Sequence, residues 1–400
     1  MYIKSYFIFI ASFFLFTHVN AQSVENIGND NTLDIATWNI EWFGNENNGP
    51  SNTTLQLNNA AAVISGSGVD LWGVQEIADG DDFETLLATL GDDYDGRLAT
   101  NSGEQKVGFI YNTNVIRVRQ VRHILESFAQ PFAFRPPLQL EADIMLPDTT
   151  VIVTFIVLHM KAFSDPDSYE RRVDASGRLK NHIDFTTLES EHVVVLGDFN
   201  DELERSTSGG RPSPYANFIE DPDDFAFVTL PIEEAGDGSF CNNSSCTSTG
   251  NMLDHILITN ELFGDYISNS AGFIPDLPDD INLFGSSTSD HLPVVARFDF
   301  SQVSTSTEIP EGVQATLTVD APYPNPFVRE SNLSLQLAAP AALRVDVYDL
   351  LGRRVETLEN RFASPGAYQY VLPADNLTPG VYLVRVAADQ VVKTMPVTLR

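Results

Sequence analysis

Polar residues that can bind cations or move protons stand at or near the ends of apolar runs along the first 300 residues. They form six clusters: Asn39 and Glu41 in ATWNIEWFG, Glu76 in LWGVQEI, His159 in VTFIVLHMKAF, Asp198 and Asn200 in VVVLGDFND, Asp254 in MLDHILI, and Asp290 with His291 in STSDHLPVV. One polar residue at the end of a strand is usually a turn residue, so only the six clusters together indicate chemistry.

These residue types suit the hydrolysis of a phosphoester. Hard divalent cations such as Mg²⁺ prefer oxygen ligands, and Glu76, Asn39 and Asp290 can supply them. Attack of water on phosphorus also needs a base that orients the water and a cation near the charged oxygens. A histidine–aspartate pair and a second histidine can provide this proton chemistry.

The apolar runs that carry these residues have the length and composition of buried strands. They cover residues 33–40, 70–74, 107–111, 138–145, 151–158, 193–196, 253–258 and 293–298. Helix-like stretches lie between them at residues 55–64, 82–90 and 169–188. Strands mixed with helices predict an α/β or α+β sandwich in which the polar strand ends meet at one rim.

The composition changes after Phe300. Residues 301–314 are rich in Ser, Thr, Pro and Gly and lack an apolar period, which predicts a linker. Residues 315–400 contain strand-like runs punctuated by Gly and Pro, which predict a small all-β sandwich. We therefore expect two domains in the 400-residue chain, at residues 22–300 and 315–400.

The first 21 residues predict a signal peptide. Lys4 precedes an apolar run at residues 6–16 that is too short to span a bilayer, and Val19 and Ala21 fit a cleavage site before Gln22. A membrane anchor is the alternative. After cleavage we expect no stable membrane span and a secreted protein, extracellular or at the cell surface. The two cysteines, in CNNSSC at residues 241–246, either close a small disulfide loop or stay as free thiols.

Acidic residues outnumber basic ones by 55 to 23, and the formal net charge is −32. This balance excludes a broad basic face for nucleic acid, so local cations must hold any phosphate substrate. The acidic tracts at residues 79–82 and 220–224 predict solvated loops, with structural Ca²⁺ as the alternative.

In their order along the chain, WNIEWF, QE, LHMKA, GDFND, LDHILI and SDHLPV resemble the motifs of the DNase I-like endonuclease/exonuclease/phosphatase superfamily. The resemblance covers roughly residues 33–300. It implies a four-layered α/β sandwich of two packed β-sheets with the site at one rim. It also implies a hydrolase that uses Mg²⁺ or Mn²⁺, with Glu76 as the principal metal ligand beside Asn39, Glu41 and Asp290.

The same resemblance implies roles for the remaining polar residues. Asp198 and Asn200 would position or deprotonate the attacking water and bind the scissile phosphate. His159 and His291 would bracket that phosphate as acid, base or charge stabiliser. Asp254 would support the base or a second cation, and the neighbouring Asp290 would also orient His291.

Two further matches to this superfamily are softer. Arg135 in FAFRPPL would contact a phosphate, and an ordinary salt bridge is the alternative. Glu104 in SGEQKVGFIY would orient His159, and a solvated loop charge is the alternative. His255 would point to the face of its strand opposite Asp254, so we leave it out of the catalytic set.

The last 80 residues carry a resemblance of their own. YPNPF at 323–327, VYDLLGRRV at 347–355 and LTPGVYLVRV at 377–386 resemble the type A sorting domain that directs cargo to the type IX secretion machinery of Bacteroidetes-like bacteria. A β-sandwich that binds substrate or carbohydrate is the alternative.

Together these patterns predict a secreted, monomeric, metal-dependent phosphodiesterase, an extracellular nuclease acting on DNA or RNA. A sphingomyelinase-like enzyme or an inositol-phosphate phosphatase remains an alternative, because all three cut a phosphoester with the same cluster. Glu104 and Arg135 favour the nuclease, and no paired aromatic hairpin suited to a membrane stands out. A non-enzymatic surface protein that keeps the fold is the third alternative.

Overall fold

The computed structural model describes residues 24–100, 103–186, 188, 191–302, 317–338, 341–350, 352–374, 377–388 and 391–400. The predicted signal peptide and most of the predicted linker lie outside these residues. Within the described part, no helix is both long and apolar enough to cross a membrane.

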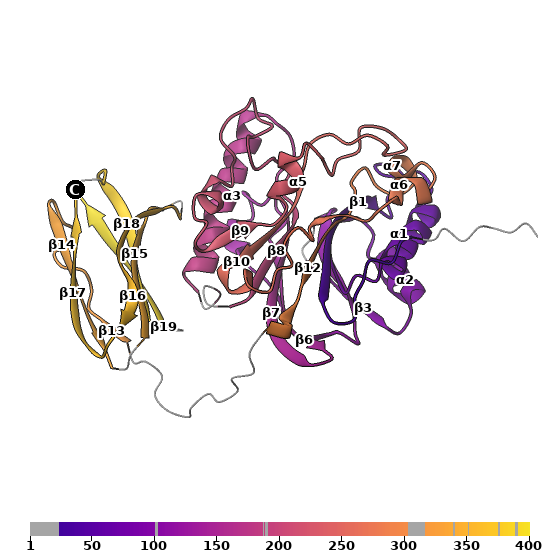
Figure 1. Ribbon diagram of the computed structural model, residues 1–400. Coiled ribbons are helices and arrows are strands. Elements are labelled where there is room, and N and C mark those ends of the chain that lie inside the picture. Colours follow the sequence, from indigo (N-terminus) through magenta and orange to yellow (C-terminus); the bar gives the residue numbers. More distant parts are fainter. Residues whose placement is uncertain are drawn as a thin grey trace, which may run out of the picture.

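Two six-stranded sheets form the larger part of the molecule (Figure 1). The first has the strand order β11-β12-β1-β2-β4-β3, with β1 parallel to β2 and antiparallel to β12. Its strands are β1 (Leu33–Phe43), β2 (Leu71–Ile77), β3 (Tyr94–Leu98), β4 (Lys106–Asn112), β11 (Gly272–Phe273) and β12 (Val294–Phe298).

The second sheet has the order β5-β6-β7-β8-β10-β9, with β7 parallel to β8 and β8 antiparallel to β10. Its strands are β5 (Ile116–His123), β6 (Leu138–Leu146), β7 (Thr149–His159), β8 (Val193–Asp198), β9 (Phe225–Phe227) and β10 (Asp254–Thr259).

Helices cover the outer face of each sheet. The long ones are α1 (Thr53–Ser67) and α2 (Gly80–Leu90) on the first sheet and α3 (Pro166–Asp184) on the second. The short ones are α4 (Ala216–Ile219), α5 (Leu230–Glu234), α6 (Leu277–Asp280) and α7 (Phe284–Ser287), with 3₁₀ turns η1 (Glu126–Phe128), η3 (Asn260–Leu262) and η4 (Phe300–Gln302).

Alternation along the strands builds the layers. In β1, Ile35 faces the core between the two sheets, whereas Trp38 packs with Trp72 beneath the helices. Successive side chains of a strand point to opposite faces, so one apolar strand supplies two cores. The four-layered sandwich predicted from the motifs is therefore confirmed.

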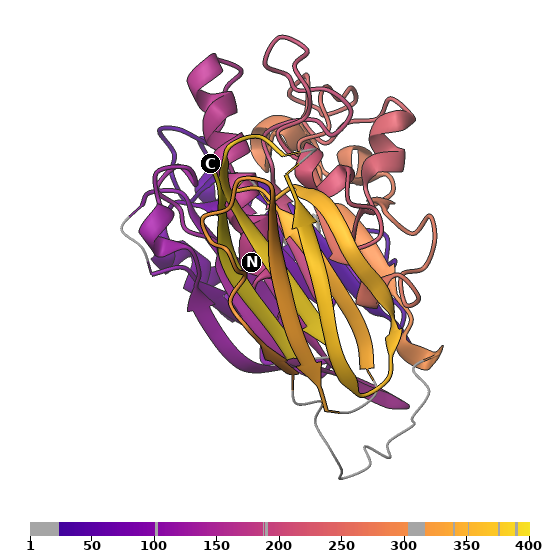
Figure 2. The same ribbon diagram turned by 90° about the vertical axis from the view of Figure 1, so that its left-hand side faces the viewer.

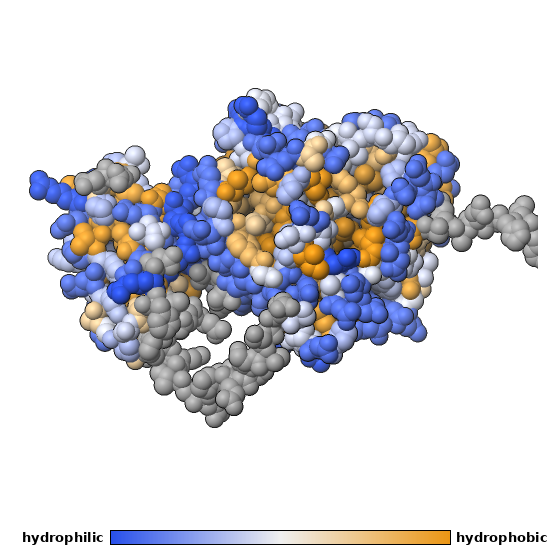
Figure 3. All heavy atoms as spheres, viewed as in Figure 1, coloured by the Kyte–Doolittle hydropathy of each residue, from blue (hydrophilic) through white to orange (hydrophobic). Residues whose placement is uncertain are grey.

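The edge strands β9 and β11 leave a hollow of about 550 Å³. Its lining includes Phe227, Ile232, Phe263 and Phe273. Figure 3 shows hydrophobic side chains gathered on the middle of this face of the larger part. The hollow also includes Ile258, near the end of β10 that lies away from the polar strand ends.

The C-terminal strands form a separate all-β unit, as predicted (Figures 1 and 2). A sheet of order β13-β14-β17 faces one of order β16-β15-β18-β19, and their apolar residues share one core. The strands are β13 (Leu317–Val319), β14 (Glu330–Leu337), β15 (Ala341–Tyr348), β16 (Arg354–Ala363), β17 (Gly366–Pro373), β18 (Gly380–Ala388) and β19 (Val391–Leu399).

The acidic tract at residues 220–224 is neither a fully solvated loop nor a set of vacant carboxylates. Arg344 of β15 lies 2.6 Å from Asp224, and Arg354 of β16 lies 2.9 Å from Asp221. These arginines neutralise much of the charge that Ca²⁺ would need, which corrects both sequence-based expectations for this tract. In the other tract, Asp79 caps the N-terminus of α2.

Candidate active site

The polar strand ends meet at one rim, as expected. The strand register places His159 opposite Asp198, and Asp198 opposite Asp254. Gly197 makes the close approach of β7 and β8 possible, because a Cβ atom there would lie 2.1 Å from the carbonyl oxygen of Leu158. The GDF segment therefore needs glycine before its aspartate.

The turn that carries Asp290 and His291 is tied to β1. The Trp38 indole donates a hydrogen bond to the carbonyl oxygen of His291 (2.9 Å), and the Ser289 hydroxyl donates to that of Asn39 (2.6 Å). From α1, the Gln56 amide donates to the carbonyl oxygens at both Glu41 and Thr288. The bond between Ser289 and Asn39 joins residues 250 positions apart at the same rim.

Three carboxyl groups gather beside β1 and β2. Burial, then the charges of Asp290 and Glu76, raise the pKa of Glu41 to about 8. Its Oε2 atom is buried without a hydrogen-bond partner among the described residues. Glu76 accepts a hydrogen bond from the backbone N–H of Trp42 (3.0 Å). Clustered carboxyl oxygens with an unmet buried acceptor fit a hard divalent cation.

Asn39 joins these carboxyl groups to Asp198. Its amide nitrogen donates to Asp198 Oδ2 (3.0 Å), and its amide oxygen accepts from the Glu41 backbone N–H (3.0 Å). An amide oxygen has two lone pairs, so one remains for a cation. Asn39 therefore orients Asp198, and its amide oxygen is one of the atoms that could hold a cation.

His291 forms a buried pair with Asp254, in which its Nδ1 lies 2.6 Å from Asp254 Oδ2. Burial lowers the pKa of His291, but the carboxylates of Asp254, Asp290 and Asp198 outweigh it and hold this pKa well above the ordinary value. Asp198, Asp254 and His291 lie close enough to suggest a metal group. The short contact between His291 Nδ1 and Asp254 Oδ2 also suits proton transfer.

His159 is buried. Its Nε2 lies 3.5 Å from Asp198 Oδ2 and 3.8 Å from Glu76 Oε1. Burial, followed by the charges of Arg135, His291 and other nearby cations, holds the pKa of His159 well below its ordinary value. Its Nδ1 is buried and has no hydrogen-bond partner among the described residues, so Nε2 is the ring nitrogen that faces the carboxylates.

Asp198 and Asn200 lie on the turn after β8. Burial, followed by the charge of Asp254, raises the pKa of Asp198 to about 7, although His291 and the Asn39 hydrogen bond act against this rise. The Asn200 backbone N–H donates to Asp198 Oδ1 (2.8 Å). A carboxyl group that titrates near neutral pH is suited to accept a proton from water.

Arg135 lies beside His159, whereas Glu104 is not brought to it. Arg135 donates to the Gln105 side chain (2.6 Å) and to the Met160 carbonyl (3.0 Å), rather than forming the ordinary salt bridge. Its guanidinium charge is thus available, although burial lowers its pKa to about 10. Glu104 is exposed, and none of the described contacts joins it to His159. Its role stays a prediction.

A cleft of about 530 Å³ opens beside Glu76 and His159. Sequence reasoning missed several residues of its lining, among them Phe134, Lys161, Phe163 and Arg171. Lys161 and Phe163 follow His159 by two and four residues in LHMKAF, which was the available signal. Phe134 directly precedes Arg135 in FAFRPPL, whereas nothing in the sequence pointed to Arg171.

Strained backbone gathers around this cleft and the carboxyl groups. Left-handed φ values occur at seven non-glycine residues there: Glu41, Trp42, Glu76, Ala133, Phe134, Phe163 and Asn200. Such conformations cost about 1–3 kcal/mol each and cluster at functional sites.

His255 is buried on the opposite face of β10, between the Thr229 hydroxyl and the Asp201 carbonyl, both at 3.1 Å from its ring. The predicted position of His255, on the face of its strand opposite Asp254, is confirmed. Cys241 and Cys246 form a disulfide, which is one of the two alternatives that the sequence left open.

The disulfide loop lies against the end of the site. The Cys241 backbone N–H donates to the Asp290 carbonyl (2.7 Å). The ring of Phe240 meets that of His291 edge-on, with 5.3 Å between centroids. The loop thus supports the segment that carries the buried histidine.

The chain was compared with known proteins. Residues 36–291 match the family model described as the Endonuclease/Exonuclease/phosphatase family, and residues 321–398 match the Secretion system C-terminal sorting domain. No curated protein matches the chain.

Several solved structures are similar to it. The human Nocturnin catalytic domain with bound sulfate anion is 17% identical, over 68% of this chain and 96% of that one, with a TM-score of 0.47. Mannosyl-6-phosphatase from Bacteroides thetaiotaomicron is 14% identical, over 66% and 99%, with a TM-score of 0.46. D. rerio TDP2 complexed with single strand DNA product is 13% identical, over 67% and 98%, with a TM-score of 0.46.

Proposed function

The chain belongs to the endonuclease/exonuclease/phosphatase family, and from this premise we propose that it is a secreted, divalent-metal-dependent phosphodiesterase that hydrolyses DNA or RNA. One observation carries the proposal: the carboxyl groups of Glu41, Glu76 and Asp290 gather beside the buried pair of His291 and Asp254. The sorting domain at residues 321–398 supports secretion through the type IX machinery.

The carboxyl groups would hold Mg²⁺ or Mn²⁺, with Glu76 as the principal ligand and Asn39, Glu41 and Asp290 beside it. When bound there, such a cation would supply positive charge to polarise a phosphoryl oxygen and to offset the negative charge of the transition state. The unmet Oε2 atom of Glu41 is the feature of the metal-free arrangement that a cation would satisfy.

The chain's own residues then carry the proton transfers. As water forms its bond to phosphorus, Asp198 takes a proton from it. As the ester bond between phosphorus and the leaving oxygen breaks, His291 gives its proton to that oxygen, and Asp254 keeps the imidazole in place. Asn200 and His159 bind the oxygens of the scissile phosphate.

The charges around the cleft favour a polyanionic substrate. Arg135, Lys161 and Arg171 all line it, in a protein whose net charge is −32. Because the protein as a whole repels polyanions, an enzyme that acts on nucleic acid needs such a local group of cations at its site. An activity assay distinguishes the nuclease from the sphingomyelinase-like, phosphatase and non-enzymatic alternatives.

The purified protein is incubated with DNA or RNA and MgCl₂, and acid-soluble nucleotides are measured. We expect their release, and we expect EDTA to stop it. Sphingomyelin and a sugar phosphomonoester are assayed in parallel, with Glu76→Gln as the control. Release of phosphate from the monoester alone, or of phosphocholine from sphingomyelin alone, would contradict the nuclease, and inactivity on every substrate would favour a non-enzymatic protein.

A further inference from the structure

Two large aromatic side chains stand exposed at the cleft beside His159. Phe134 is 64% exposed and Phe163 is 75% exposed. Both have left-handed backbones, with φ values of 62° and 77°. Bulky residues rarely adopt this conformation. The backbone at both residues is strained, yet the two apolar rings stay exposed to water instead of packing in a core. Exposed apolar side chains on strained backbone are typical of binding surfaces.

A cation lies near the face of each ring. The Lys161 ammonium is 4.3 Å from the centroid of Phe163, and the Arg171 guanidinium carbon is 5.9 Å from that of Phe134. Each turn of the cleft thus presents an aromatic face together with a positive charge. This combination is suited to a ligand that has both flat rings and anionic groups.

Adjacent arginines of α3 hold the two turns. Arg171 donates two hydrogen bonds to the carbonyl oxygen of Gln130, in the turn that leads to Phe134 (3.0 and 2.6 Å). Arg172 donates to the carbonyl oxygens of Lys161 (2.6 Å) and Phe163 (2.8 Å). Both aromatic turns are therefore fixed to one helix before any ligand binds.

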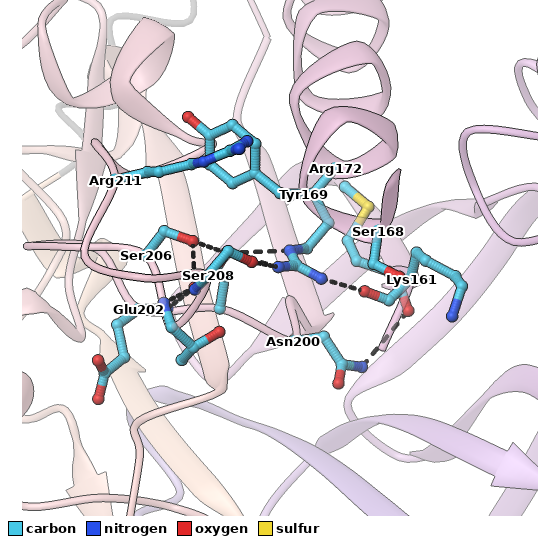
Figure 4. A network of polar contacts seen from close by, with 12 residues as sticks. Lys161, Ser168, Tyr169, Arg172, Asn200, Glu202, Ser206, Ser208 and Arg211 are labelled. Carbon is cyan, nitrogen blue, oxygen red and sulfur yellow. Dashed lines mark hydrogen bonds and ion pairs between the residues drawn. The ribbon is translucent and has the colours of Figure 1, made fainter. Parts of the chain in front are cut away.

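Arg172 also connects the cleft to the catalytic turn. It is fully buried, pairs with Asp201 (2.9 Å) next to Asn200, and donates to the Ser208 hydroxyl (3.0 Å). Figure 4 shows it reaching from α3 to both the Lys161 segment and the loop of Ser206 and Ser208. Such preorganisation reduces the entropy that binding would otherwise lose.

We propose that Phe134 and Phe163 form a stacking site for unpaired bases of single-stranded nucleic acid, and that Lys161 and Arg171 bind its neighbouring phosphates. The proposal rests on the proposed function, which places the scissile phosphate beside His159. The cleft, at about 530 Å³, lies within the usual range for small-ligand sites.

The chemistry selects single strands. In a duplex the faces of the bases are covered by their neighbours, so exposed rings cannot stack on them. Every base has such a face, so the site tolerates any sequence. A membrane surface is the other common use of exposed aromatic residues. The position of both rings in a cleft with cations, beside the carboxyl groups, favours the nucleic acid.

Binding is measured in the Glu76→Gln background, which slows cleavage, by fluorescence anisotropy. The probes are a labelled thymidine octamer, a duplex of the same length and an abasic octamer with the same backbone. We expect the thymidine octamer to bind more tightly than the duplex. Phe134→Ala or Phe163→Ala should each raise its Kd about tenfold, the scale of one base–aromatic stack, and should leave the abasic Kd unchanged.

Matched variants separate stacking from charge and from general damage. Phe128 is 40% exposed and has the Arg178 guanidinium carbon 3.9 Å from its ring centroid, but it lies outside the cleft lining, so Phe128→Ala should change no Kd. Lys161→Gln should weaken the binding of the thymidine and abasic octamers equally, because it removes a contact with phosphate.

The outcomes distinguish this proposal from the proposed function. If Phe134→Ala and Phe163→Ala lose equal affinity for the thymidine and abasic octamers, or if the protein prefers the duplex, the stacking proposal is overturned. Loss of binding to sphingomyelin vesicles, with no change on oligonucleotides, would assign the rings to a membrane. If the wild type cleaves no nucleic acid but the expected Kd changes are found, the stacking site stands and the nuclease proposal fails. If the wild type cleaves nucleic acid but the phenylalanine variants keep unchanged Kd values, the nuclease proposal stands and the stacking site fails.

Discussion

Asp254 accepts a hydrogen bond from His291 Nδ1 at 2.6 Å, and both side chains are buried. Asp254 is the first residue of β10, and His291 lies just before β12, so the pair joins the two sheets at their rim. The carboxylate fixes the ring and stabilises its positive charge, which leaves Nε2 as the atom that can meet a substrate.

Replacing Asp254 by Asn should lower kcat about 100-fold or more, because the ring loses both its orientation and its stabilising charge. His291→Ala and His159→Ala should have effects of similar size. Initial rates on a thymidine octamer test this, with circular dichroism as a check on folding. Asp265, which lies 3.9 Å from His192 in a partly exposed pair away from the site, gives the control Asp265→Asn. Near-normal turnover in a site variant would remove that residue from the mechanism.

Divalent cations should stabilise the folded protein, since they bind the gathered carboxyl groups and not the unfolded chain. The midpoint of thermal unfolding should therefore rise with MgCl₂ or MnCl₂. In Glu76→Gln this rise should largely disappear, while the fold is retained. The exposed Glu84 supplies the control Glu84→Gln. An unchanged rise in Glu76→Gln would reject Glu76 as the principal ligand.

Asp70, away from the site, should make stability depend on pH. Burial raises its pKa to about 7, from 3.8, against a hydrogen bond from the Asp34 backbone N–H. The protonated Asp70 carboxyl group contributes to the free energy of unfolding. This contribution is fully present below pH 4 and is lost as the pH rises through 7, because Asp70 loses its proton at lower pH in the unfolded state than in the folded state. Asp70→Asn keeps an acceptor without charge, so its advantage over wild type should grow with pH, by on the order of 2 kcal/mol at pH 8.

Urea unfolding at pH 5 and pH 8, followed by tryptophan fluorescence, measures this difference. All three tryptophans, Trp38, Trp42 and Trp72, lie in the larger part, so the C-terminal sandwich does not contribute to the signal. Asp92→Asn, at an exposed aspartate, is the control. A stability difference that is equal at both pH values would show that Asp70 is ionised in the folded protein.

A chain that ends at residue 302 should fold and keep its turnover, since every proposed site residue lies before it. It should lose about 1 kcal/mol of stability, because Asp221 and Asp224 lose Arg354 and Arg344. Asp224→Asn should restore part of this loss in the shortened chain. Failure of the shortened chain to fold would show that the two parts share a core.

Local patterns in the sequence located most of the fold and the rim of the site. Motifs such as GDFND combine a buried strand with its polar end, so one short segment shows both the element and the functional residue. β5 was missed because IRVRQVRH alternates apolar and basic residues on a largely exposed edge strand. β3 was also missed, because its sequence, YDGRL, has no apolar run and only Gly96 in it is fully buried.

The cleft could not be predicted, because its parts meet only in three dimensions. Phe134 and Phe163 lie on turns 29 residues apart, and their exposure depends on left-handed backbones that no local pattern requires. The acidic tract at 220–224 was misread for a related reason. Its partners, Arg344 and Arg354, come from strands more than 100 residues further along the chain.

The disulfide beside His291 has a consequence for when the site is completed. Cys241 is hydrogen-bonded to Asp290 through its backbone, and Phe240 lies against the histidine ring. Thiols stay reduced in the cytoplasm and pair only in oxidising compartments. In a chain with a secretion sorting domain, the bond that closes this loop forms only after the protein has left the compartment in which it is made. The support of His291 therefore matures together with export, and newly synthesised chains still lack it.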